Sequence, residues 1–186
     1  MDPDEILLTA EEAMEKSGEH LSHELASIRT GKASPALVEN LEVEAYGSTM
    51  RLKQLALIST PEPRLLMITP FDASTTSFIE KAIRESRLGI NPAVDGKVIR
   101  LPIPELSEER RKDLVKSVKQ MGEEARVRVR ANRRTGMEDL KKSQKDGDIT
   151  EDDLRRYEDE VQKLTDKFVG KIDEMITAKE KELLTI

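Results

Sequence analysis

The fold is decided by one segment, residues 107–145, with the sequence SEERRKDLVKSVKQMGEEARVRVRANRRTGMEDLKKSQK. Its apolar residues recur at the three- and four-residue spacing of an amphipathic helix. These positions are Leu114, Val118, Met121, Ala125, Val129 and Leu140. Ser107 is placed to cap the helix, and Glu108 and Glu109 suit the positive end of the helix dipole. The segment predicts one long helix, which Gly122 and Gly136 should weaken by about 1 kcal/mol each relative to alanine.

Two other segments carry the same kind of apolar pattern. Residues 1–30 repeat an apolar residue every seven positions, which is typical of a bundle seam. The positions are Leu7, Met14, Leu21 and Ile28, with Ala10 and Leu25 between them. After a turn at residues 145–148, Thr150 and Asp153 match a capping box that opens a further helix. Its seam comprises Leu154, Tyr157, Val161, Leu164, Phe168, Ile172, Met175 and Leu183. Three such helices predict a three-helix bundle.

The chain between the first two helices has a different composition. Seven of the eight prolines lie between Pro35 and Pro104, whereas the flanking helices are nearly free of proline. We therefore expect a separate domain at residues 31–104, inserted into a bundle formed by residues 1–30 and 105–186. The connections would form a two-stranded hinge that permits rigid-body reorientation. The hinge residues would be Thr30, Gly31 and Lys32 on one strand and Pro102, Ile103 and Pro104 on the other.

The inserted domain shows short strand-like patterns rather than long helical ones. Residues 41–45 alternate between apolar and polar side chains, a turn follows at 46–48, and apolar runs occur at 55–58 and 65–68. A helix is expected at about 73–87, with Phe78, Ile79, Ala82 and Ile83 on its apolar side. Residues 90–94 and 98–101, joined by Asp95 and Gly96, are typical of a hairpin. The domain should be a small mixed α/β fold.

Basic residues concentrate in the second half of the long helix. A step of 100° per residue places six of them on the face opposite the apolar seam. This basic stripe comprises Lys119, Arg126, Arg130, Arg133, Arg134 and Lys141. Glu123 is its main acidic neighbour, so most of these cations lack a partner four residues away. Because guanidinium groups match phosphate bidentately, the stripe suits a polyanion, above all nucleic acid. Arg128 points toward the apolar seam and is expected to pair with another helix.

Several classes of chemistry are not indicated. There is no cysteine for a disulfide, a thiolate metal site or a nucleophile. His20 and His23 lie one turn apart without a further specified ligand, so we expect surface histidines and no metal site. Residues 31–34 resemble the end of a phosphate-binding loop, but Ala26 and Ala33 stand where glycine and Ser or Thr are required. The sequence therefore predicts a protein that is not an enzyme and needs no cofactor.

The expected location follows from what the sequence does not contain. The first five residues are acidic and lack the basic and apolar regions of a targeting peptide. No apolar run approaches the length of a membrane span. We expect a soluble cytoplasmic protein without a membrane partner.

Charge alone leaves other interpretations of the basic stripe open. Runs of Arg and Lys on a helix are often only a solvated face. The same stripe on a helical adaptor or chaperone-like protein would bind acidic protein surfaces. A generic RNA-binding module is a third interpretation, although the stripe has no aromatic residues on which bases could stack.

Five segments, in order along the chain, resemble the bacterial ribosome recycling factor family. They are residues 29–35 (RTGKASP), 88–92 (LGINP), 99–102 (IRLP), 108–112 (EERRK) and 162–167 (QKLTDK). The resemblance covers essentially the whole chain. It implies an α+β protein with an elongated three-helix bundle and an inserted α/β domain, L-shaped and tRNA-like in outline.

The resemblance also implies a function. A family member acts as a monomer after translation termination and, with elongation factor G and GTP, splits the ribosome into subunits and releases the mRNA. The bundle would lie on large-subunit rRNA at the intersubunit face. The implied rRNA-binding residues are Arg130, Arg133 and Arg134, with Arg126 beside them on the stripe and Arg29 in a family motif. The inserted domain would meet elongation factor G and move about the hinge.

Three positions depart from the usual family pattern. Met50 stands where proline is usual, Phe71 where tryptophan is more typical, and residues 135–137 bring a glycine into the long helix. The first two are expected to affect the fit to the factor partner more than the fold. Gly136 is expected to make the end of the helix more pliable.

Overall fold

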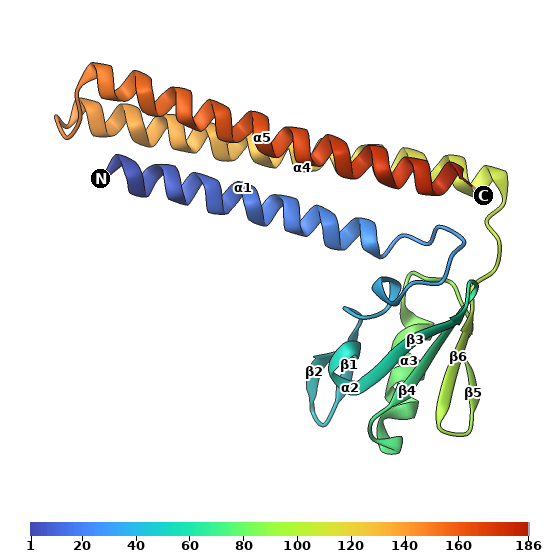
Figure 1. Ribbon diagram of the computed structural model, residues 1–186. Helices are drawn as coiled ribbons and strands as arrows, with labels where there is room; N and C mark the ends of the chain where they lie inside the picture. Colours follow the sequence, from blue (N-terminus) through green and yellow to red (C-terminus); the bar gives the residue numbers. More distant parts are fainter. Residues whose placement is uncertain (186) are drawn as a thin grey trace. The chain divides into compact units, whose positions relative to one another are not determined.

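The computed structural model describes residues 1–185, which form two compact units. Unit 1 consists of Met1–Leu25 and the chain from Lys112 onward, and unit 2 consists of Ala26–Arg111 (Figure 1). The boundaries between the units along the chain thus lie at residues 25/26 and 111/112, whereas the sequence predicts them at 30/31 and 104/105. One reason is that Arg64 holds the second connection on unit 2. Its carbonyl oxygen accepts a hydrogen bond from the Ile103 N–H at 2.7 Å, and its guanidinium pairs with the Glu105 carboxylate.

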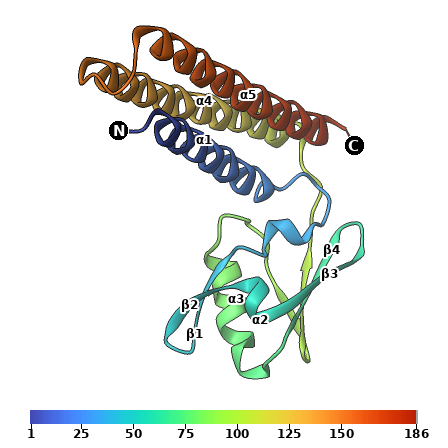
Figure 2. The ribbon, with the colours of Figure 1, turned by 60° about the vertical axis from the view of Figure 1, so that its left-hand side comes forward.

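Unit 1 is the predicted three-helix bundle. Its helices are α1 (Pro3–Ala26), α4 (Glu108–Lys145) and α5 (Glu151–Leu184), which run side by side in both ribbon views (Figures 1 and 2). The seam between them is mostly apolar. Its fully buried large side chains are Met14, Leu21, Leu140, Ile172 and Leu183. No helix in residues 1–185 combines the length and apolar character that a bilayer crossing needs.

The predicted helix caps are confirmed. Ser107 Oγ accepts a hydrogen bond from the Arg110 N–H at 3.2 Å, at the start of α4. Thr150 and Asp153 form both bonds of a capping box at the start of α5, at 3.1 and 3.4 Å. Gly147, with φ of +80°, turns the chain between these helices in a conformation that glycine adopts without steric cost. Local side-chain chemistry therefore sets the helix limits at these points.

The seam of α1 differs from the predicted one at both ends. Ile6 is buried at 2% exposure, whereas Leu7 is only half-buried. Ile6 precedes Ala10 by four residues and therefore lies on the same helix face, which counting in sevens from Leu7 misses. At the other end, α1 stops at Ala26, so Ile28 lies beyond the helix.

The seam of α5 also differs from the predicted one, by one position at each of two places. Thr165 and Ile176 are buried, whereas Leu164 and Met175 are half-buried. A threonine can occupy this core because its hydroxyl donates to the Val161 carbonyl oxygen at 2.9 Å. The hydrophobic pattern alone could not identify a buried polar residue of this kind.

Two glycines of α4 lie in the helix contacts. A Cβ atom on Gly122 would stand 2.7 Å from Cγ1 of Ile176, which is shorter than side chains tolerate. At Gly136 the nearest atom would be the Ala10 Cβ at 3.5 Å, an ordinary contact distance. Gly122 therefore permits the close approach of α4 and α5, a role that its helix propensity did not suggest. The pliability expected at Gly136 stays a prediction.

Unit 2 contains two antiparallel sheets. The first pairs β1 (Glu42–Ala45) with β2 (Ser48–Arg51), through a turn in which Tyr46 and Gly47 have φ of 54° and 75°. The second has the strand order β3-β4-β6-β5. Its strands are β3 (Ala56–Glu62), β4 (Leu65–Pro70), β5 (Ala93–Asp95) and β6 (Val98–Pro102). The hairpin predicted at residues 90–101 is confirmed by the pairing of β5 with β6, although β5 begins only at Ala93, and the turn predicted at 46–48 is also present. The pairing of β4 with β6, across the intervening helix, was not predictable from local pattern.

The helix α3 (Thr76–Glu85) carries the buried residues Ile79 and Ile83, which belong to the same core as Ile68 and Ile99 of the larger sheet. The sequence also placed Phe78 on this buried side, and that prediction is wrong, because Phe78 is 47% exposed. It precedes Ile79 by one residue and is therefore turned 100° away from it. Three short elements were not predicted: η1 (Pro35–Leu37), α2 (Leu52–Leu55) and η2 (Ala73–Thr75).

The two glycines of α4 should respond oppositely to alanine. Gly136→Ala should stabilise unit 1 by up to about 1 kcal/mol, because alanine is the better helix former and the site has room. Gly122→Ala should lower the free energy of unfolding, since overpacking costs about 1–3 kcal/mol and exceeds that gain. Urea unfolding followed by circular dichroism would measure both. A Gly122→Ala variant as stable as the unsubstituted protein would show that Ile176 moves aside freely.

Candidate nucleic-acid interface

The basic stripe lies along α4, and its members differ in exposure. Lys119, Arg130, Arg134 and Lys141 are exposed, whereas Arg133 is half-buried. The side chain of Arg126 is only 22% exposed. The stripe is therefore not a uniform row of solvated cations, and each arginine has to be considered by its contacts.

Arg126 links α4 to α5. Its Nε donates to Oδ1 of Asp173 at 2.8 Å, and its Nη1 lies 3.3 Å from Oε2 of Glu123. The hydrogen bond to Asp173 raises the pKa of Arg126 above its ordinary value, so the guanidinium stays positively charged. Arg126 thus fixes two helices to each other, and most of its donors face protein rather than solvent.

Glu123 pairs with two arginines of the stripe. Besides Arg126, three residues away, it accepts a hydrogen bond from Nη1 of Arg130, seven residues away, at 3.3 Å. Counting only partners four residues away misses both of these ion pairs of Glu123. The side chains of Arg130 and Glu123 remain 57% and 58% exposed, so their contact is a surface ion pair.

Arg133 and Arg134 are held differently. Nε of Arg133 donates to Oε1 of Gln162 on α5 at 2.7 Å, which orients the guanidinium and leaves its other nitrogens available. Within residues 1–185, no hydrogen bond or ion pair restrains Arg134, which is exposed. The stripe therefore combines an arginine oriented by a hydrogen bond with one that has no such restraint, and both can donate to an incoming anion.

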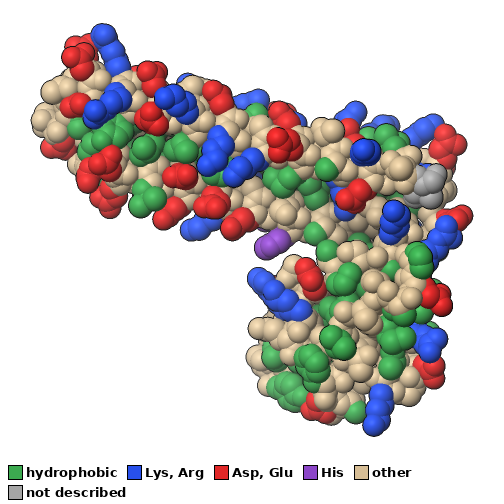
Figure 3. Space-filling model, viewed as in Figure 1, with side chains coloured by type: hydrophobic (Ala, Val, Ile, Leu, Met, Phe, Trp, Pro, Cys, Tyr) green, Lys and Arg blue, Asp and Glu red, His purple; other side chains and the backbone are tan. Residues whose placement is uncertain are grey.

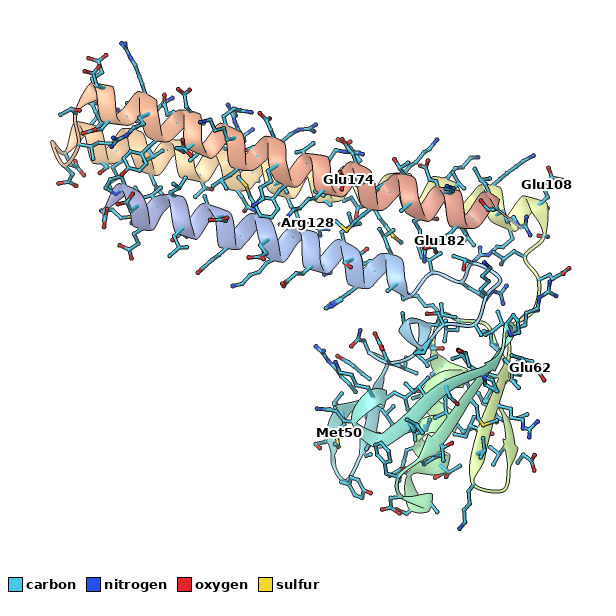
Figure 4. All side chains as sticks on the ribbon, viewed as in Figure 1. Met50, Glu62, Glu108, Arg128, Glu174 and Glu182 are labelled. Carbon is cyan, nitrogen blue, oxygen red and sulfur yellow. The ribbon has the colours of Figure 1, made fainter. Side chains whose placement is uncertain are left out.

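Arg128 pairs with another helix, as the sequence predicted. Its Nη2 lies 3.8 Å from Oε1 of Glu24 on α1, and Figure 4 shows Arg128 at the junction of these helices. Two of its nitrogens, Nε and Nη2, are buried without a hydrogen bond. Arg128 is therefore part of the α1–α4 contact and not of the anion-facing surface.

Arg29 belongs to unit 2, whereas the basic stripe belongs to unit 1. Burial and the nearby positive charge of Arg110 lower the pKa of Arg29 from its ordinary value. A guanidinium whose charged form is disfavoured in this way is stabilised when an anion binds beside it. Arg29 therefore lies near a second cation in unit 2, apart from the basic stripe.

The predicted hinge residues differ in how firmly unit 2 holds them. Gly31 has φ of +90° and is buried, a backbone conformation that favours glycine. On the other connection, Pro102 is the last residue of β6 and Ile103 is 2% exposed within the unit 2 core. On that side, Pro102 and Ile103 are therefore built into the sheet and the core of unit 2.

The histidines lie on the surface of α1. His20 pairs with the Glu24 carboxylate, and both histidines are exposed. In the part of the chain that the structure describes, no three His, Cys, Asp or Glu side chains come together as a metal-binding group.

Unit 2 exposes aromatic residues that the sequence pattern did not single out as a surface. Tyr46 and Phe71 are 64% and 70% exposed, and Phe78 is also exposed. The Tyr46 hydroxyl donates to Oδ2 of Asp72 at 2.5 Å, which places Tyr46 next to the Phe71–Asp72 segment. This bond lowers the pKa of Asp72 and raises that of Tyr46, so the carboxylate stays charged. We call Tyr46, Phe71 and Asp72 the Tyr46–Phe71 patch.

The surfaces of the two units differ in the space-filling view. Along the bundle, side chains of both charges are interspersed, whereas apolar side chains cover much of the visible face of unit 2 (Figure 3). The exposure of its aromatic side chains, which is known only from the structure, identifies unit 2 as carrying a second candidate surface. Three of the chain's five Phe and Tyr residues are exposed in unit 2.

Comparisons with known proteins agree with the family resemblance. The model of the family "Ribosome recycling factor" matches residues 21–184. The ribosome-recycling factor of Akkermansia muciniphila is 55% identical, with 100% of both chains covered. That of Halalkalibacterium halodurans is 54% identical over 98% of each chain.

Solved structures give the same result. The chain is similar to a solution structure of the ribosome recycling factor, with a TM-score of 0.80, 43% identity and coverage of 100% and 99% of the two chains. A second similar chain comes from models of the T. thermophilus ribosome recycling factor and the E. coli elongation factor G bound to the E. coli post-termination complex. Its TM-score is 0.69 at 44% identity, covering 99% of this chain and 100% of that one. The protein with the basic stripe therefore belongs to the ribosome recycling factor family.

Proposed function

We propose that the protein recycles ribosomes after termination. It binds large-subunit rRNA through the basic stripe and, with elongation factor G and GTP, splits the post-termination ribosome into subunits and releases the mRNA. It does so as a monomeric factor that catalyses no reaction itself. The observation that carries the proposal is the row of Arg130, Arg133 and Arg134 along a helix held in a rigid bundle. The related chain bound to a post-termination complex supports this assignment over a helical adaptor.

The charge distribution of unit 1 favours one orientation on RNA. Unit 1 carries 19 Lys and Arg against 26 Asp and Glu, so its net charge is −7. The net charge of this surface repels phosphate, whereas the exposed arginines of the stripe attract it. An acidic body with one basic face therefore binds RNA in a defined orientation, which a uniformly basic protein would not.

The bundle also prepares the stripe for binding. Gln162 orients Arg133, and the Arg126–Asp173 pair fixes the helix that carries both arginines. Side chains that are ordered before binding lose less conformational entropy when the complex forms. A stiff bundle can in addition transmit displacement of unit 2 to the rRNA contact.

Removal of the central arginines should weaken RNA binding and flatten its salt dependence. For Arg130→Ala and Arg133→Ala, the slope of log K against log salt should fall by about 0.7–0.9 for each phosphate that is no longer neutralised. Binding of large ribosomal subunits, measured by filter retention over a salt series, tests this. Arg84→Ala combined with Arg87→Ala is the matched control, because it removes two exposed arginines from unit 2. An unchanged slope in the double variant would refute direct binding of phosphate by these arginines.

We further propose that unit 2 meets elongation factor G through the Tyr46–Phe71 patch. Contiguous exposed apolar patches often mark interaction sites, and aromatic side chains are enriched where proteins dock. The ionised Asp72 within the patch disfavours phosphate, which makes a protein a better partner than RNA. The patch suits a partner that offers an apolar pocket beside a lysine or arginine.

The patch proposal predicts a selective defect for Phe71→Ser. This variant should bind large subunits normally but should need several-fold more elongation factor G for half-maximal subunit splitting, because a central aromatic anchor contributes strongly to docking. Light scattering of post-termination ribosomes measures the splitting. Val94→Ser, an exposed apolar residue on β5, is the control. Equal factor requirements in both variants would exclude the patch as the docking surface.

The connections between the units are proposed to act as the hinge, with Thr30, Gly31 and Lys32 on one side. Replacing Thr30 and Lys32 by glycine increases the freedom of this connection, so motion of unit 2 is passed on less effectively. The variant should therefore bind large subunits normally and split ribosomes more slowly. Loss of subunit binding would contradict this separation of anchoring from force transmission.

A further inference from the structure

We propose that Glu123 is a built-in competitor for phosphate on the basic stripe, which holds Arg130 in the free protein and promotes release of the RNA. The inference deepens the proposed function and rests on its rRNA contact. Glu123 would act as a positioning residue, through Arg130, and would not touch the RNA itself.

The first step is the geometry of the carboxylate. Oε1 of Glu123 lies 3.3 Å from Nη1 of Arg130, and Oε2 lies 3.3 Å from Nη1 of Arg126. Each oxygen thus accepts from a different guanidinium. An anionic group that bridges two arginines occupies the kind of position that a phosphate takes between them. The free protein therefore already fills part of its proposed anion site.

The second step is the asymmetry between the two arginines. Arg126 has a second partner, Asp173, with Nη2 and Nε at 2.6 and 2.8 Å from Oδ1. For Arg130, Glu123 is the only ion-pair partner found within residues 1–185. If Glu123 moves away, Arg126 stays attached to α5 and Arg130 is released. The exchange therefore changes one phosphate-binding group and leaves the helix packing intact.

The third step is where the carboxylate can go. Glu123 and Lys119, one helical turn apart, line the same shallow groove between α4 and α5. Lys119 is exposed, and a pair at this spacing is favourable on a helix. Glu123 can therefore exchange Arg130 for Lys119 by a side-chain rotation within the groove, without any change in the backbone.

The exchange has a kinetic consequence. A phosphate on Arg130 would stand close to the Glu123 carboxylate, and the two negative charges repel each other. Binding must displace Glu123, and Glu123 competes for Arg130 whenever the phosphate dissociates from it. Affinity differences of this kind are expressed mostly in the dissociation rate. A factor that acts once per round must leave its site, and Glu123 assists this step.

The test compares Glu123→Gln with Glu124→Gln. Both remove one negative charge from neighbouring exposed positions, so they change the long-range field alike. The Glu124 carboxylate, however, accepts a hydrogen bond from Gln120 at 3.3 Å and not from an arginine. Dissociation from large ribosomal subunits is measured for both, alone and combined with Arg130→Ala.

Glu123→Gln should dissociate about two- to fivefold more slowly than Glu124→Gln, the range expected for a surface ion pair. The difference should disappear when Arg130 is alanine. Equal rates in the two single variants, or a difference that persists without Arg130, would overturn the inference. Arg133→Ala is measured alongside. If it weakens binding while the glutamate variants agree, only the competitor role fails, whereas an unaffected Arg133→Ala variant would remove the rRNA contact and the inference with it.

Discussion

The close packing of α4 between α1 and α5 is the constraint on which the other features of unit 1 depend. The seam is narrow, and at Gly122 there is no room even for a methyl group beside Ile176. Close approach of two helices increases dispersion contacts along their length and excludes water from the seam. It also leaves one face of α4 permanently turned outward. The arginines are presented on that face because the opposite face is fully used in packing.

Charge and packing are coupled at the centre of the stripe. Arg126 is held at the α4–α5 contact by Asp173 of α5. Arg133 is oriented by Gln162, which also lies on α5. The surface that binds an anion is thus built by α5 as much as by α4. Polar contacts near the surface contribute little to stability, and the value of these two lies in holding the arginine side chains in place. Such an arrangement suits an interaction that must form and then be released.

Much of the fold follows from the sequence by local rules. The helix starts at Ser107 and Thr150 were predictable because capping needs only a side-chain oxygen and the first-turn N–H groups. The turn at residues 46–48 was also predictable, because Gly47 readily adopts the positive φ that the turn needs. Helical geometry alone placed the arginines on one face of α4. It also turned Arg128 toward another helix, which the pair with Glu24 confirms.

The tertiary structure decided what local rules cannot reach. Ile6 rather than Leu7 and Ile176 rather than Met175 are buried, because neighbouring helices determine which of two adjacent apolar residues enters the seam. The partner of Arg126 comes from residue 173, far along the chain, so helix spacing could not reveal it. The sequence by itself therefore determined the three long helices, their caps and the face of α4 that carries positive charge. Only the packing of separate segments decided which of those charges are held by protein and which are free to meet an anion.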